Sequence, residues 1–174
     1  MFAAEIRKRR AHHGWDSNCR WHLDEVFVKI NGETHYLWRA ADHEGEVLEV
    51  FATKRRDRTV ALQFLKRAMK RYGQPKGVVT ERLRSYRAAM NVIGNAADQK
   101  YGRRLNNRAK NTPQPFRRRE GAMSKFWDVK TLQKCASIYA SIHNHFNLKR
   151  HLTPREPFKQ NRAAAMPEWR QLAA

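Results

Sequence analysis

The feature that most constrains the fold is a series of three apolar runs, rich in β-branched and aromatic residues, joined by short turns. The first two runs, 21–30 and 34–41, are separated by Asn31 and Gly32. This residue pair tolerates the positive φ angles of a tight hairpin turn better than any other. A third run covers 47–53 after another short turn. The pattern predicts three antiparallel strands arranged as a meander.

A helix and a fourth strand are predicted next. Asp57 is suited to cap a helix, and apolar residues recur after it at three- and four-residue spacing as far as Tyr72. Gly73 and Pro75 end this pattern. The short apolar run 77–80 then predicts a buried strand. Because a helical crossover leads to it, we expect this strand to be parallel to its neighbour.

The rest of the chain is predicted to be mainly helical. Ser85 is a candidate cap for a helix that ends near Ile93, and residues 94–116 are polar and interrupted by glycine and proline. Apolar periodicity predicts a long helix over 128–146 and a last helix over roughly 162–172. The expected fold class is therefore α/β, with a mixed sheet (an antiparallel meander plus a parallel strand) flanked by helices.

The charge of the chain is large and unevenly distributed. The 174 residues include 36 Lys and Arg against 16 Asp and Glu, a net charge of +20. Residues 22–51 hold seven acidic residues against two basic ones, whereas 54–71 and 100–119 each hold eight basic residues with at most one acid. Such a basic chain favours nucleic acid as a partner. The acidic segment suits a nuclease-type metal site within a DNA-binding surface, or alternatively a solvated hairpin face.

Other classes of protein are excluded or disfavoured. No run approaches the ~18 apolar residues that a membrane-spanning helix needs. Cys19 and Cys135 have no paired spacing, which disfavours a zinc site or a disulfide framework. We therefore expect a cytoplasmic protein that has reduced thiols and no membrane partner.

Asp24 is the first candidate for chemistry. It lies in the middle of the first predicted strand. Side chains alternate across a strand, so Asp24 shares a face with His22, Val26 and Val28, while Glu25 points the other way. A carboxylate on an apolar face is costly unless it is paired or binds a cation.

Glu81 is the second candidate. It directly follows the predicted strand 77–80, and ligands collect at strand ends in parallel sheets. Carboxylates at Asp24 and Glu81 that face one cleft would suit Mg²⁺, which prefers oxygen ligands. The sequence therefore suggests a divalent metal site between these two strands.

Four segments together resemble one known family. They are WHLDEVFVKINGETHYLWRAADHEGEVLEVFATKRRD, VVTERLRSY, LNNRAKN and FRRRE. The chain resembles, over roughly residues 5–172, the catalytic domain of bacterial insertion-sequence DDE transposases, most closely the group that forms cointegrates. The resemblance implies an RNase H-like domain over 21–174, Mg²⁺ or Mn²⁺ as cofactor, and strand transfer of element ends into target DNA.

The resemblance also assigns an acidic triad, which this sequence matches only in part. Asp24 matches the first acid. Glu81 stands where the family has Asp, and Lys110, behind Asn106 and Asn107, stands where the family has Glu. The family's mechanism uses two metals, of which Asp24 and Glu81 would be the ligands here. Lys110 brings a cation to a metal site, and we hypothesise that it neutralises Asp24 and Glu81 in place of metal.

Function and organisation follow from this resemblance. We expect a transposase domain that acts in DNA recombination but is catalytically impaired, or alternatively a non-enzymatic DNA-binding remnant that associates with an intact transposase or with further copies of itself. Only 23 residues precede Asp24, so residues 1–20 are expected to be a basic arm left by truncation of a DNA-reading module. The basic residues expected to contact DNA phosphates are Lys54, Arg55, Arg56, Arg103, Arg104, Arg108, Arg117, Arg118 and Arg119.

Overall fold

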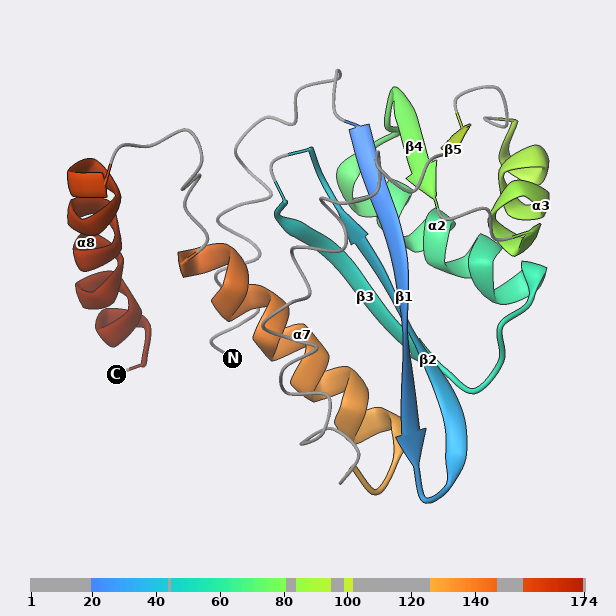
Figure 1. The fold of residues 1–174 in the computed structure, drawn as a ribbon, viewed down its shortest axis with the longest axis horizontal. Helices are drawn as coiled ribbons and strands as arrows, with labels where there is room; N and C mark the ends of the chain where they lie inside the picture. The colour runs from blue at the N-terminus through green and yellow to red at the C-terminus, as the bar shows by residue number, and fades with distance from the viewer. Residues whose placement is uncertain are drawn as a thin grey trace.

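The computed structural model describes residues 20–43, 45–80, 84–94, 99–101, 126–146 and 155–173. Five strands and four helices are assigned in these segments and are labelled as in Figure 1. In chain order they are β1 (Arg20–Ile30), β2 (Glu33–Ala41), β3 (Val47–Thr53), α2 (Arg58–Tyr72), β4 (Gly77–Thr80), α3 (Arg84–Ile93), β5 (Gln99–Tyr101), α7 (Val129–Phe146) and α8 (Arg155–Ala173).

The strands form one mixed sheet in the order β3-β2-β1-β4-β5. The pairs β1–β2 and β2–β3 are antiparallel, whereas β4 is parallel to both β1 and β5. The predicted meander and the predicted parallel fourth strand are therefore confirmed. The three-residue strand β5 lies in a segment that was expected to be irregular, because a strand this short leaves no readable alternation.

The hairpin turn between β1 and β2 sets the register of the sheet. Asn31 and Gly32 both have positive φ angles, of 51° and 81°, as a two-residue turn of this kind requires. Ile30 therefore pairs with Glu33, and the pairing continues along both strands until Asp24 lies opposite Arg39. A turn of another length would bring a different residue opposite Asp24.

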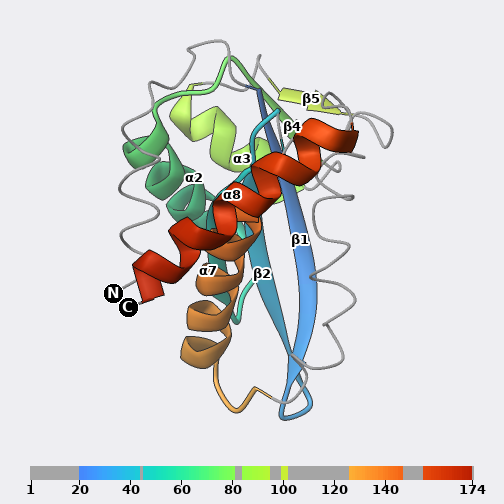
Figure 2. The same ribbon diagram turned by 90° about the vertical axis from the view of Figure 1, so that its left-hand side faces the viewer.

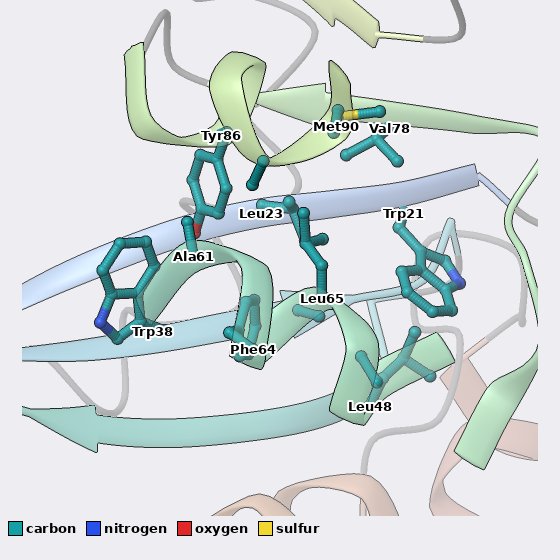
Figure 3. Close-up of a cluster of buried hydrophobic side chains, with 13 residues drawn as sticks. Trp21, Leu23, Trp38, Leu48, Ala61, Phe64, Leu65, Val78, Tyr86 and Met90 are labelled. Atoms are coloured by element: carbon teal, nitrogen blue, oxygen red, sulfur yellow. The ribbon is translucent and has the colours of Figure 1, made fainter. Parts of the chain in front are cut away.

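One face of the sheet is covered by α2 and α3 (Figure 1) and carries the aromatic part of the core. Trp38 on β2 packs edge-on against Tyr86 of α3, with ring centroids 5.4 Å apart, and lies 6.1 Å from Phe64 of α2. Figure 3 shows these three rings close together, and all three side chains are fully buried.

The other face is covered by α7 (Figures 1 and 2) and is built mainly from smaller aliphatic side chains. Leu132 and Ala136 of α7 are buried against it. The strand residues of this second cluster are Val26, Val28, Ile30, Leu37, Val47, Val50 and Ala52. The expectation that Val26 and Val28 share the face of Asp24 is confirmed.

Two amide side chains of α7 occupy the open edge of β3. Gln133 accepts a hydrogen bond from the Ala52 N–H (2.7 Å) and donates one to the Val50 carbonyl (2.9 Å). Asn144 forms the same two kinds of bond with the backbone of Val47, at 2.8 and 2.7 Å. The backbone groups of an edge strand otherwise invite pairing with another chain. Here α7 satisfies them in place of a sixth strand.

The helix ends agree with the predictions in most places. Asp57 caps α2 by accepting a hydrogen bond from the Val60 N–H at 2.9 Å, and Asp128 caps α7 in the same way through Thr131 at 2.6 Å. The predicted cap at Ser85 is wrong, because α3 begins one residue earlier and Ser85 lies inside its first turn.

The last helix, α8, begins at Arg155 and is longer than predicted. It continues through Pro167, where we expect a bend because proline cannot donate the internal helical bond. None of the helices described is long and apolar enough to cross a membrane.

Candidate active site

Asp24 lies in the middle of β1 on the face covered by α7. Its side chain is only 6% exposed, and its neighbours on that face include the buried residues His22 and Val26. Strand alternation turns Glu25 to the opposite face, as predicted. The sequence interpretation of Asp24 as a buried carboxylate on an apolar face is therefore confirmed, and such a group requires a compensating charge.

That charge is supplied in part by Arg39, a residue that the sequence interpretation missed. Arg39 lies directly opposite Asp24 on β2, and its Nη2 atom is 3.4 Å from Asp24 Oδ2. The Arg39 side chain is 5% exposed, so both partners are shielded from water. The signal was present in the sequence, because the Asn31-Gly32 turn alone brings residue 39 opposite residue 24.

Glu25 forms a different kind of pair on the face covered by α2 and α3. Its Oε2 atom is 2.9 Å from Arg56 Nη2, and the Glu25 side chain is 7% exposed. Burial raises the pKa of Glu25 to about 7, against the opposing effect of the Arg56 charge. Burial also raises the pKa of the nearby Tyr86 hydroxyl, with a further contribution from the charge of Glu25. Glu25 is thus a buried acid whose charge is only partly compensated.

The predicted DNA contacts at 54–56 differ from one another in their surroundings. Arg56 also stacks over the Phe27 ring, 5.1 Å from its centroid. Lys54 Nζ is 2.7 Å from Glu33 Oε2 at the surface, and Arg55 is exposed. Since Arg56 pairs with Glu25, its guanidinium lies on the face of the sheet opposite Asp24. The structure therefore does not bring Arg56 together with the candidate catalytic acid.

Glu49 explains another part of the acidic segment. It is buried on β3 and contacts two arginines of α2, Arg67 (3.4 Å) and Arg71 (2.8 Å). Glu25, Glu33 and Glu49 therefore all form ion pairs with basic residues of the segment 54–71. Three of the seven acids in 22–51 are therefore compensated by this basic segment.

The remaining predicted site residues lie outside the described residues. They are Glu81, Arg103, Arg104, Arg108, Lys110, Arg117, Arg118 and Arg119. Strand β4 ends at Thr80, and its residue Val79 is paired with His22 of β1. Among the residues that the structure describes, no cluster of three or more His, Cys, Asp or Glu side chains suits a metal ion.

Comparison with known sequences gives a family match over most of the chain. A family model described as a DDE domain matches residues 18–151. The transposase for the insertion sequence-like element IS431mec of Staphylococcus aureus is 41% identical over 71 residues, a match that covers 41% of this chain and 32% of that protein. The transposase of IS257 in transposon Tn4003 of S. aureus matches equally. The matched segment spans about a third of the length of these curated relatives.

Solved structures also resemble this fold. A chain of the simian T-cell lymphotropic virus intasome, solved in complex with PP2A regulatory subunit B56 gamma, aligns with a TM-score of 0.51 at 16% identity, covering 83% of this chain and 58% of that one. The HTLV-2 integrase catalytic core domain aligns with a TM-score of 0.49 at 15% identity, covering 80% of this chain and 90% of that one. The mixed sheet is RNase H-like, and the chain belongs to the DDE-domain family of insertion-sequence transposases.

Proposed function

We propose that this chain is the catalytic domain of an insertion-sequence transposase, acting in DNA recombination by metal-dependent strand transfer and impaired by two of its own residues. The observation that carries the proposal is the place of Asp24. It is a buried carboxylate at the middle of β1, the strand beside the parallel strand β4. In a family of DDE domains, this is where the first acid is expected.

The residues present fit a divalent cation in part. Asp24 offers carboxylate oxygens, the donor type that Mg²⁺ and Mn²⁺ prefer, from a position shielded from water. His22 is paired with Val79, and Asp24 and Glu81 each follow two residues further along the chain. This register supports Glu81 as the second ligand. When bound, the metals would activate a water or a DNA 3′-OH and stabilise the leaving oxygen.

The impairment follows from positions 81 and 110. Glu81 is one methylene longer than the family's Asp, and a displacement of ~1 Å at a reacting centre can cost ~10²-fold in rate. Lys110 replaces an acid by a cation, which opposes the binding of a second positive ion. Both residues are read from the sequence and lie outside the described residues.

DNA is the proposed substrate because the chain is strongly basic and belongs to a transposase family. The predicted contacts Lys54, Arg55 and Arg56 are all exposed in the structure, and two of them, Lys54 and Arg56, form ion pairs with Glu33 and Glu25. We propose Arg55, together with the arginines of 103–119, as the phosphate contacts. Association with an intact transposase or with further copies of the chain, in the cytoplasm, completes the proposal.

One observation favours a second candidate function. Asp24 already has a cationic partner in Arg39, so the charge of this buried acid is compensated in part without metal. A domain of this kind can keep its fold after losing its chemistry. The alternative is therefore a non-enzymatic DNA-binding remnant that associates with DNA or with an active transposase.

A plasmid-nicking assay separates the two functions. Wild type, the double variant Glu81→Asp/Lys110→Glu, and that double variant with Asp24→Asn are compared on supercoiled DNA in Mn²⁺. We expect the double variant to nick about 10²-fold faster than wild type, and Asp24→Asn to abolish the gain. The exposed acid Glu33, changed to Gln in the same background, is the matched control.

Two results would contradict the proposal. If wild type nicks as fast as the double variant, the claim of impairment is wrong. If the double variant nicks no faster than its Asp24→Asn derivative while all the proteins still bind DNA, the remnant function replaces the transposase function. DNA binding is checked by its salt dependence, since log K falls by ~0.9 per phosphate contact for each tenfold rise in salt.

A further inference from the structure

Arg39 differs from the other cations that form ion pairs in the described part of the chain. In the ion pairs found among the described residues, the cationic side chain otherwise reaches its partner from the surface. Arg56 is 33% exposed, Arg71 is 41% exposed and Arg67 is 47% exposed. Arg39 is 5% exposed and sits inside the sheet face that α7 covers. A buried guanidinium is costly, so its position beside Asp24 calls for a specific reason.

The reason does not lie in the packing of the second core cluster. Arg39 is paired in register with Val50 on one side and with Asp24 on the other. An aliphatic residue at this position would extend the apolar surface formed by Val28, Leu37 and Val50. What an aliphatic residue cannot do is balance the charge of Asp24.

We propose that Arg39 is the resident counter-ion of Asp24: it holds the carboxylate charged and in place without metal, and it competes with the divalent cation for that carboxylate. This inference rests on the proposed metal-dependent function. Arg39 is a positioning residue in this scheme, because it acts on substrate only through Asp24. The affinity for metal is therefore set in part by a side chain on the neighbouring strand.

Two opposite effects of Arg39 on metal binding must be weighed. By fixing one rotamer of Asp24 it would favour binding, and by placing a positive charge beside the same carboxylate it would oppose binding. Asp24 is 6% exposed within a closely packed strand, so packing already limits its rotamers. Repulsion between two cations is weakly screened where water is excluded. We therefore expect the electrostatic effect to dominate.

The test replaces Arg39 by a side chain of similar length without charge. Mn²⁺ affinity is measured by electron paramagnetic resonance of free Mn²⁺ and by the shift of the urea unfolding midpoint with Mn²⁺ concentration. For Arg39→Met we expect Mn²⁺ to bind about tenfold more tightly than to wild type, within the range usual for coupled sites. Arg39→Lys keeps the charge and should stay within about threefold of wild type. Arg56→Met makes the same change on the opposite face and should leave Mn²⁺ affinity unaltered.

The inference is overturned if Arg39→Met binds Mn²⁺ no more tightly than wild type, whether or not wild type binds it. If Arg39→Met is unfolded in EDTA, the readout is whether Mn²⁺ refolds it, and refolding supports the inference. Failure to refold at 10 mM Mn²⁺ overturns the inference, because the metal would then not replace the missing charge. This concentration is about ten times a Kd of ~1 mM. A different result would show that the proposed function itself is wrong: the double variant Glu81→Asp/Lys110→Glu would nick DNA no faster than the same variant carrying Asp24→Asn.

Discussion

Two acids in neighbouring positions of β1 lie on opposite faces of the sheet, and their cationic partners differ in how deeply they are buried. Glu25 lies on the aromatic face beneath α2 and α3, and its partner Arg56 reaches it from the rim with a third of its side chain exposed. Asp24 lies on the aliphatic face beneath α7, and its partner Arg39 is as deeply buried as the acid itself. One strand thus carries a rim ion pair and an internal ion pair one residue apart.

This difference indicates that the two faces of the sheet have different roles in the domain. The aromatic face holds the larger part of the core, with Trp38, Phe64 and Tyr86 in contact (Figure 3). The aliphatic face has less apolar volume and carries the internal ion pair and the amide contacts of α7. We infer that the first face mainly stabilises the fold, and that the second is built around the candidate active site.

The largest expected effect is a difference in the free energy of unfolding between substitutions in the hydrophobic clusters on the two faces of the sheet. Phe64→Ala on the aromatic face should lower the free energy of unfolding by about 4 kcal/mol, and Val28→Ala on the aliphatic face by about 2 kcal/mol, because the larger deletion leaves the larger cavity. Urea denaturation measures both. Equal losses would show that the aromatic face is not the more important half of the core.

The next effect is a pH dependence confined to the rim pair. Burial raises the pKa of Glu25 from 4.5 to about 7, so the folded state keeps a proton that the unfolded chain releases. The contribution of protonated Glu25 to the free energy of unfolding is fully present below pH 4.5, and it is lost as the pH rises to about 7. The loss should be on the order of 2 kcal/mol relative to Glu25→Gln. It is measured as the difference between the two urea unfolding curves across this window.

Glu33 supplies the control for that experiment. Its exposed carboxylate has a pKa that the hydrogen bond from Lys54 lowers, so Glu33→Gln should leave the fall in stability between pH 4.5 and 7 in place. If Glu25→Gln follows wild type throughout this range, the carboxylate is solvated rather than buried.

A smaller effect tests the amide contacts of α7 with β3. Asn144→Leu and Gln133→Leu should each cost about 1.5 kcal/mol, because each leaves buried backbone groups of the edge strand without partners. Asn144→Asp keeps the acceptor for the Val47 N–H but loses the donor, so we expect roughly half that loss. Gln63→Leu on the exposed side of α2 is the matched control and should be within ±0.5 kcal/mol of wild type.

A leucine variant at Gln133 or Asn144 that unfolds like the Gln63→Leu control would contradict this role of α7. Such a result would mean that water satisfies the edge of β3 equally well. The aggregation of each variant, measured by light scattering, is a second readout because an open strand edge promotes pairing between chains.

Most of the fold could be predicted from local signals. The Asn31-Gly32 turn, the alternation along β1 and the cap at Asp57 each depend on neighbours in sequence, and each prediction is confirmed. The strand Gln99–Tyr101 could not be predicted, because its existence depends on pairing with β4 rather than on its own pattern. The early start of α8 at Arg155 was missed for a similar reason, since the preceding residues show no clear apolar periodicity.

The candidate site was predictable in part. The need of Asp24 for a compensating charge follows from strand alternation alone, whereas identifying Arg39 as its partner requires the register that the Asn31-Gly32 turn sets. The pairs of Glu25 with Arg56 and of Glu49 with Arg71 join different elements in space. In the sequence, the acids and the arginines of these pairs lie in separate acidic and basic segments. Only the fold shows that their charges compensate each other.

The most direct test of the account is a double-mutant cycle on the internal ion pair, using urea unfolding in EDTA. Asp24→Asn and Arg39→Met each remove one partner and should each cost about 3 kcal/mol, because the other partner is left buried and uncompensated. The double variant should cost less than the sum of the two by about 2 kcal/mol. Losses that add to within about 0.5 kcal/mol would show that Arg39 does not balance the charge of Asp24.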